Sequence, residues 1–203
     1  GNIPPPVVLT DQAATRRGIL ERLAAIGRDL KPQDVLVVYI ASHGVMDDGE
    51  YAMVTHEFDG RLSDSNSIGA GEIVRLARDA RALKQIWVLD TCHAGGIGRS
   101  LRGLMDAQVS VLARQAGVHM MAAANTAEQA KDGHKGNGLF THAILKALKS
   151  GEVDFNRDGR ASALEFGEFS RDEATVIARQ VGWNQTPLLL RQGRDFDVYR
   201  VPR

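Results

Sequence analysis

The sequence contains a single cysteine, Cys92, among 203 residues. One cysteine excludes a disulfide within the chain and any zinc site built from several cysteines. It fits a reducing compartment, and we expect a cytoplasmic protein. The sequence also lacks an excess of charge of one sign, since 25 basic residues balance 25 acidic ones. A neutral chain has no overall attraction to nucleic acid or to an anionic membrane, so we expect neither as a partner.

Long apolar segments are missing as well. No run approaches the roughly 18 residues of a transmembrane helix, and no signal peptide is recognisable. The sequence opens at Gly1 and soon reaches three consecutive prolines, so we expect a fragment whose upstream part would carry any targeting information. No linker or internal repeat divides the chain, and its length suits one α/β domain.

What the sequence does contain is an alternation of strands and helices. Three apolar runs are typical of central parallel strands covered on both faces: residues 35–41, 86–89 and 118–124. Helices are predicted at residues 12–28, 68–81, 104–116, 139–148 and 163–180. Shorter strands are predicted at residues 7–9, 50–55, 188–190 and 196–201. This order predicts one α/β domain over residues 1–203, with a mostly parallel sheet sandwiched between helices in three layers.

A histidine and the only cysteine each follow one of the apolar strands. His43 comes directly after residues 35–41, and Cys92 comes just after residues 86–89. Because parallel strands end at the same edge of a sheet, the two side chains would meet there. A cysteine nucleophile needs an imidazole to handle protons, and Gly44 would offer an unobstructed N–H to an oxyanion. The alternative is an ordinary buried thiol beside an unrelated loop histidine.

The residues around both positions resemble the caspase and metacaspase superfamily, most closely its bacterial caspase-like peptidases and metacaspases. The resemblance rests on Ser42-His43-Gly44 after one strand and on Asp90-Thr91-Cys92-His93-Ala94-Gly95 after the next, about 50 residues later. It extends to residues 119–132, 138–141 and 185–187. It implies a bacterial cysteine endopeptidase of caspase-like fold, whose first strand and first helix would precede Val7 and are missing from this chain.

The resemblance also assigns roles to single residues. Cys92 would be the nucleophile and His43 the general acid that protonates the leaving amine, without any cofactor. The N–H groups of Gly44 and Cys92 would form the oxyanion hole, and Ser42 and Asp90 would contact the polypeptide substrate. A carboxylate at position 90 would attract a basic P1 side chain and repel an acidic one, at a cost of roughly 2–5 kcal/mol for a buried unpaired charge.

Three alternatives to this assignment remain. In the first, Asp90 would be a strand-end carboxylate that accepts loop N–H groups. In the second, the peptidase would prefer Asp or an apolar residue at P1. In the third, the chain would be a catalytically silent caspase-like scaffold.

Activation is a further expectation from the resemblance. The missing strand would leave a sheet edge exposed, and a regulatory domain or partner chain is expected to supply it. In the family, the segment after the cysteine is often cut during activation. Arg99, Arg102 and Arg114 would then be self-cleavage sites of an enzyme with a basic P1 preference. A solvated basic loop is the alternative.

A second motif, at residues 154–165, matches the twelve-residue EF-hand loop. Its expected calcium ligands are the side chains of Asp154, Asn156, Asp158, Ser162 and Glu165 and the carbonyl of Arg160. Gly159 would allow the sharp turn. Ala161 departs from the larger residue usual in paired loops, and the sequence has no second loop to pair with. A polar turn that caps the next helix through Asp158 or Ser162 is the alternative, and a calcium-sensor module would be a third function.

Overall fold

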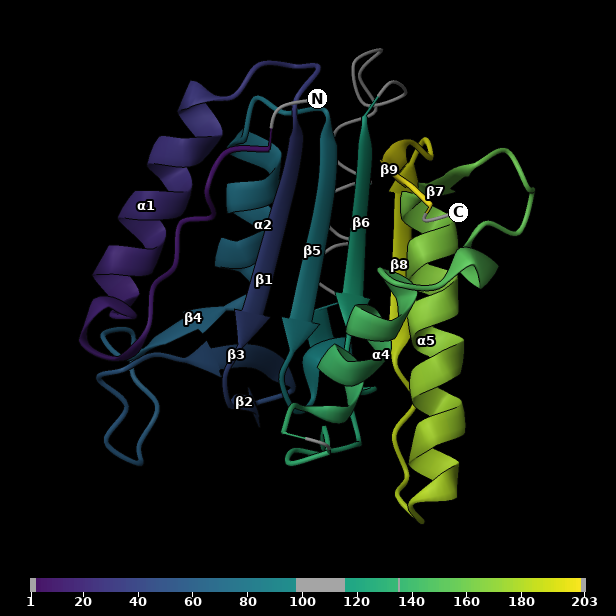
Figure 1. Cartoon of the computed structure of the whole chain (residues 1–203). Coiled ribbons are helices and arrows are strands. Elements are labelled where there is room, and N and C mark those ends of the chain that lie inside the picture. Colours follow the sequence, from purple (N-terminus) through teal and green to yellow (C-terminus); the bar gives the residue numbers. More distant parts are fainter. Residues whose placement is uncertain (1–2, 98–115, 135, 202–203) are drawn as a thin grey trace.

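The fold is built around a four-stranded sheet. The computed structural model describes residues 3–97, 116–134 and 136–201. The strands lie in the order β1-β5-β6-β8 (Figure 1). Their bounds are Val35–Ala41 for β1, Lys84–Asp90 for β5, Gly117–Ala122 for β6 and Leu188–Gly193 for β8. The first three strands are parallel and β8 is antiparallel to β6, so the predicted mostly parallel sheet is confirmed.

Helices cover both faces of this sheet. The structure has α1 and α2 over one face and α4 and α5 over the other (Figure 1). Their bounds are Arg16–Asp29, Ala70–Asp79, Leu139–Ala147 and Ala163–Gln180. Because successive strand side chains point to opposite faces, Trp87 joins the core beneath α1 and α2, whereas Val88 joins the core beneath α4 and α5. The three-layer α/β fold is therefore confirmed. No helix in the described part of the chain is long and apolar enough to cross a membrane.

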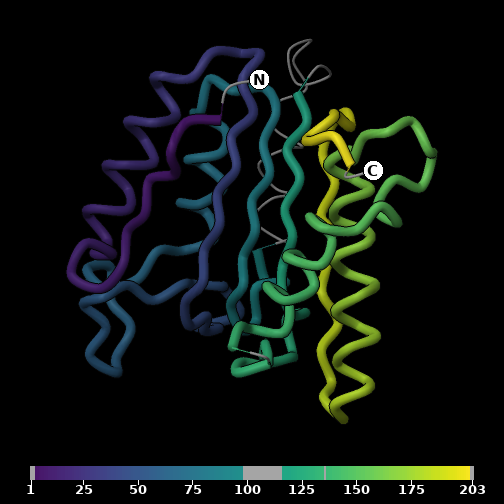
Figure 2. Tube along the Cα trace, in the orientation of Figure 1, coloured from purple at the N-terminus to yellow at the C-terminus, as the bar shows by residue number. Residues whose placement is uncertain are grey.

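The N-terminal segment differs from the prediction. Residues 7–9 are not a strand, because no described strand offers them a ladder of backbone hydrogen bonds. They run in the direction opposite to α1 (Figure 2). A short 3-10 turn, η1 (Asp11–Ala13), precedes α1, which starts later than predicted because the Thr15 hydroxyl caps it by accepting the N–H of Gly18 at 3.0 Å. The helix predicted at residues 104–116 falls almost entirely outside the described residues.

Two smaller sheets complete the fold. β2 (Gly44–Asp47), β3 (Glu50–Val54) and β4 (Ser67–Gly69) form one antiparallel sheet, and β7 (Arg160–Ser162) pairs with β9 (Asp197–Arg200) in the other. Two short 3-10 turns are η2 (Ala94–Gly96) and η3 (Gly151–Val153). The sequence predicts β3 and β9 but misses β2, β4 and β7. Strands of three or four residues are too short to show an alternating pattern, and only their partners stabilise them.

One edge of the main sheet is formed by β1. Leu36 and Val38 are buried beneath the helices, whereas Val37 is 57% exposed and Tyr39 is 49% exposed. Among the described residues, no strand pairs with the free side of β1. Residues 35–41 are therefore an edge strand with one face exposed, and the prediction of a central strand covered on both faces was wrong for them.

Candidate active site

The predicted histidine and cysteine follow two neighbouring strands at the same edge of the sheet. The parallel register of β1 and β5 places Ala41 beside Asp90. His43 and Cys92 each come two residues after these partners. The arrowheads of β1, β5 and β6 point to this end of the molecule, where β2 and β3 also lie (Figure 1). His43 is exposed and Cys92 is partly buried, so a substrate can reach both.

Gly44 lies against the backbone of the cysteine. A Cβ atom at position 44 would be 2.1 Å from the carbonyl oxygen of Cys92 and 2.9 Å from the hydroxyl of Thr91. Only glycine allows so close an approach. The segment that carries His43 therefore touches the segment that carries Cys92.

The hairpin of β2 and β3 holds this contact in place. The N–H of Val54 donates to the carbonyl of His43 at 3.0 Å, and the hydroxyl of Ser42 donates to the carbonyl of Val54 at 2.8 Å. The Tyr51 hydroxyl lies 2.7 Å from the Thr91 hydroxyl, and burial raises the pKa of Tyr51 to about 12. Ser42, predicted to contact the substrate, thus uses its hydroxyl to bind the hairpin.

A loop between β6 and α4 borders the cysteine. His93 has a left-handed backbone with φ of 56°, and its N–H donates to the carbonyl of Glu128 at 3.1 Å. The Nδ1 of His93 lies 2.9 Å from the carbonyl oxygen of Thr126. The Sγ of Cys92 lies 4.0 Å from the carbonyl oxygen of Ala130. The turn after Cys92 and this loop are therefore joined by hydrogen bonds.

A buried glutamine supports the loop from its other side. Gln185 is only 2% exposed. Its side-chain amide donates to the carbonyl of Ala123 at 2.9 Å and accepts the N–H of Lys131 at 2.8 Å. Trp183 adds a hydrogen bond to the carbonyl of Gln129 at 3.1 Å. The sequence motif at residues 185–187 marked this segment, but nothing local indicated that Gln185 connects Ala123, just after β6, to the loop.

Asp90 lies at the N-terminus of α4. Its Oδ2 accepts the N–H of Thr141 at 3.2 Å and also the hydroxyl of Thr141. Burial raises the pKa of Asp90, the bonds from Thr141 lower it, and the nearby charge of Asp132 raises it. The alternative role predicted for this carboxylate is acceptance of loop N–H groups, and the N–H that it accepts here belongs to helix α4. Thr141 was not predicted as a site residue, because its contact with β5 is visible only in three dimensions.

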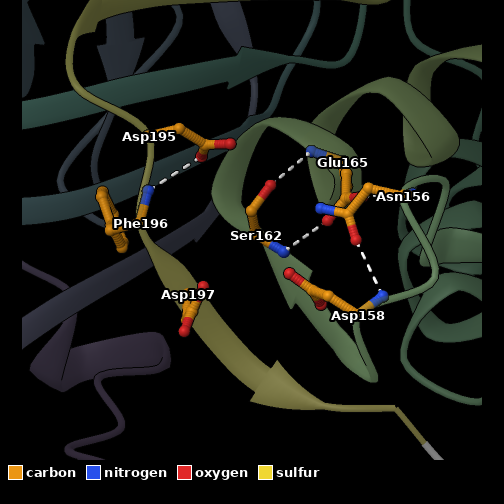
Figure 3. Close-up of a pocket in the computed structure, with 7 residues that line it drawn as sticks. All are labelled: Asn156, Asp158, Ser162, Glu165, Asp195, Phe196 and Asp197. Carbon is orange, nitrogen blue, oxygen red and sulfur yellow. Dashed lines mark hydrogen bonds between the residues drawn. The ribbon is translucent and has the colours of Figure 1, made fainter.

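The second motif folds into a compact loop beside α5 (Figure 3). Gly159 has φ of 84°, so the expected sharp turn is present. The Asp154 carboxylate accepts the N–H groups of Asp158 and Gly159, and the Glu165 carboxylate accepts those of Asn156 and Ser162. In residues 3–97, 116–134 and 136–201, no three His, Cys, Asp or Glu side chains stand close enough together to hold a metal.

A pocket lies between this loop and three residues near the C-terminus. Asp195, Phe196 and Asp197 lie opposite Asn156, Asp158, Ser162 and Glu165 (Figure 3). The backbone of Ala161 pairs with that of Tyr199, because β7 and β9 are antiparallel neighbours. The strand of the motif thus pairs with the chain's own β9, although the sequence offers no second loop. Asp195 and Asp197 were missed, since they are far from the motif in sequence.

The candidate self-cleavage sites Arg99, Arg102 and Arg114 lie outside the described residues. They stay predictions.

Comparisons with known proteins agree with this architecture. The family model of the caspase domain matches residues 7–172. No curated protein matches the sequence. A protein from Geobacter sulfurreducens has a similar crystal structure, with a TM-score of 0.60 and 18% identity over 93% of this chain and 77% of its own. Caspase-1 from Spodoptera frugiperda gives a TM-score of 0.53 and 12% identity over 86% of this chain and 66% of its own. At such low sequence identities, these structural similarities show a shared fold alone. Because the family match covers most of the sequence, the chain belongs to the caspase domain family.

Proposed function

We propose that this chain is a cysteine endopeptidase with His43 and Cys92 as its catalytic dyad. The thiolate of Cys92 attacks the scissile carbonyl carbon, and His43 gives a proton to the leaving amine as the C–N bond breaks. Water then hydrolyses the thioester. The N–H groups of Gly44 and Cys92 would bind the oxyanion. The observation that carries this proposal is the contact of Gly44 with the Cys92 carbonyl, which brings the two residues' segments together.

The proposal includes a metacaspase-type preference for Arg or Lys at P1. Asp90 is partly buried and comes two residues before Cys92. A fixed carboxylate in such a place attracts a cationic side chain and disfavours an anionic one. Asp132 contributes a second negative charge near Asp90. A charge-charge preference of this kind is worth roughly 2–5 kcal/mol, or about 30-fold and more in rate.

A panel of four peptides tests this function. The peptides differ only at P1, which is Arg, Lys, Asp or Leu, and a fluorogenic group reports cleavage. We expect kcat/KM for Arg and Lys to exceed that for Asp by about 30-fold or more. A preference for Asp or Leu would overturn the basic P1 assignment. If no peptide is cleaved and a thiol-reactive activity probe fails to label Cys92, the catalytically silent scaffold is favoured instead.

The exposed edge supports a proposal about partners. A strand from a regulatory domain or partner chain would pair with the free backbone edge of β1, beside its exposed side chains Val35, Val37 and Tyr39. A location in the bacterial cytoplasm, where a lone thiol stays reduced, belongs to the same proposal.

We also propose that residues 154–165 bind Ca²⁺ and that the ion rigidifies this loop without taking part in peptide cleavage. The donor atoms would be the side-chain oxygens of Asp154, Asn156, Asp158, Ser162 and Glu165 and the carbonyl of Arg160. All are oxygens, the donors that Ca²⁺ prefers. The carboxylates of Asp154 and Glu165 now accept backbone N–H groups, so binding would require them to turn toward the ion.

Calorimetric titration with calcium tests this site. We expect heat of binding with the wild type and a loss of affinity of about tenfold or more in Glu165→Gln, because the bidentate ligand loses its charge. Glu152→Gln is the matched control, since Glu152 is exposed and lies just outside the loop. An absence of heat with the wild type would remove the calcium proposal and favour a helix-capping turn.

A further inference from the structure

The two carboxylate oxygens of Asp90 have different surroundings. Oδ2 accepts two hydrogen bonds from Thr141, one from its N–H and one from its hydroxyl. No described residue donates a hydrogen bond to Oδ1. One oxygen is therefore fixed by the protein, and the other remains available to a ligand.

The hydroxyl of Thr141 is itself oriented from β1. The Tyr39 hydroxyl lies 2.6 Å from the Thr141 Oγ1. A threonine hydroxyl has one proton to donate, and Thr141 donates it to Asp90. Tyr39 must then be the donor to Thr141. Burial raises the pKa of Tyr39, so the phenol keeps its proton. The result is a directed chain of hydrogen bonds from Tyr39 through Thr141 to Asp90.

The N-terminus of α4 is shaped for this contact. Gly138 is the N-cap residue, and a Cβ there would lie 2.9 Å from the Asp90 Oδ2. A side chain at this position would push the carboxylate away from Thr141. The absence of one lets α4 approach the end of β5, where its N-terminus favours a negative charge.

The charge of Asp90 depends on these bonds. Burial raises the pKa of this carboxyl, and the bonds from Thr141 oppose that effect. Within the part of the chain that the structure describes, the titratable groups near Asp90 are Tyr39 from β1 and Asp132 from the loop that leads into α4. Neither supplies a positive charge. Thr141 therefore supplies the described hydrogen bonds that favour the ionised form.

We propose that Tyr39 and Thr141 are positioning residues for substrate specificity, which hold Asp90 so that its Oδ1 faces the basic P1 side chain. This inference rests on the proposed function. Neither residue would touch the scissile bond, because both act through Asp90. An ion pair depends on the orientation of the carboxylate. Loss of the hydrogen bonds from Tyr39 through Thr141 therefore weakens binding of the P1 residue more than it slows the chemical step.

Steady-state kinetics with Arg and Leu peptides test the inference on Thr141→Val, Thr141→Ser and Tyr39→Phe. We expect Thr141→Val to raise KM for the Arg peptide about tenfold, the size of a hydrogen bond to a charged group, with a smaller change in kcat. The ratio of kcat/KM for Arg over Leu should fall by a similar factor. Thr141→Ser should restore both values, and Tyr39→Phe should show the same changes to a smaller extent. Thr175→Val in α5, whose hydroxyl donates to the carbonyl of Arg171, is the matched control.

The pH dependence gives a readout that loss of packing would not produce. Removal of the Thr141 hydroxyl removes a bond that lowers the pKa of Asp90, so this pKa rises. The acidic limb of kcat/KM for the Arg peptide should then move to higher pH. In the Cys92→Ala protein, an NMR titration of the Asp90 carboxyl carbon measures the same shift without activity. Should Thr141→Val fail to fold, Tyr39→Phe carries the test, because Tyr39 is half exposed.

The outcomes separate the two proposals. A wild type without any preference for Arg overturns the basic P1 assignment, and the specificity role falls with it. An Arg-selective wild type whose Thr141→Val variant keeps its KM, its selectivity and the pKa of Asp90 overturns the positioning role alone.

Discussion

Replacement of Cys92 by alanine is expected to lower kcat/KM for an Arg peptide by about 10⁴-fold or more. The thioester cannot form without the sulfur, and the oxyanion hole and substrate contacts alone leave only a residual rate far below that of the intact site. Cys92 is partly buried, and within the described residues its thiol makes one long hydrogen bond, 4.0 Å to the carbonyl oxygen of Ala130. The fold should therefore persist, with circular dichroism and thermal unfolding close to the wild type. Fluorogenic assays on purified protein measure the loss.

Substitutions of two histidines, His43 and His93, provide the comparison. His43→Ala should cost nearly as much as Cys92→Ala, and the double variant should lose no more than Cys92→Ala alone, because residues that act as a unit are not additive. His93→Asn is the control, since asparagine tolerates the left-handed backbone found there. It should stay within about tenfold of the wild type. Activity that survives in Cys92→Ala would contradict the catalytic assignment.

Asp90→Asn is expected to lower kcat/KM for an Arg peptide by about 100-fold. The amide keeps the shape of the carboxylate and can still accept the bonds from Thr141, but the substrate guanidinium loses its partner. An unpaired charge in a partly buried site costs roughly 2–5 kcal/mol, and the estimate lies within that range. The Leu peptide lacks this charge and should lose much less. The same fluorogenic peptides measure both values.

Asp132→Asn is the matched control for charge. Asp132 is exposed, so solvent screens its effect on the substrate and we expect a loss of less than about tenfold. An equal loss for the Arg and Leu peptides in Asp90→Asn would contradict the P1 role. It would instead favour the other function noted for this carboxylate, that of holding the N-terminus of α4.

Much of the fold could be predicted because its signals are local. The apolar runs before His43 and Cys92 predict the positions of β1 and β5 well. Only β5 is buried on both faces and needs apolar side chains at every position, whereas β1 is an edge strand with one face exposed. The amphipathic pattern predicts α5 at its observed bounds. The prediction was wrong for residues 7–9, which have strand-like side chains but no strand to pair with. Backbone hydrogen bonds depend on a neighbour, and a local pattern cannot supply one.

In the candidate site too, some residues could be predicted from local sequence and others could not. Its motif residues, His43, Cys92 and Asp90, could be identified from the sequence because each follows a recognisable strand. Gln185, which spans from Ala123 to Lys131, and Thr141, which binds Asp90, are ordinary residues in their local context. Their roles arise from contacts across more than 50 residues of sequence.

The sequence by itself determined which residue types are present for the chemistry, because a lone cysteine, a histidine and a carboxylate each follow an apolar strand. Only the tertiary structure decided how these groups are held. The parallel register of β1 and β5 brings the segments of His43 and Cys92 to one edge, and Gly44 lets them touch. The approach of α4 to β5 then turns one oxygen of Asp90 inward and leaves the other available. Such contacts depend on how separate elements pack against each other, which no local pattern of residues encodes.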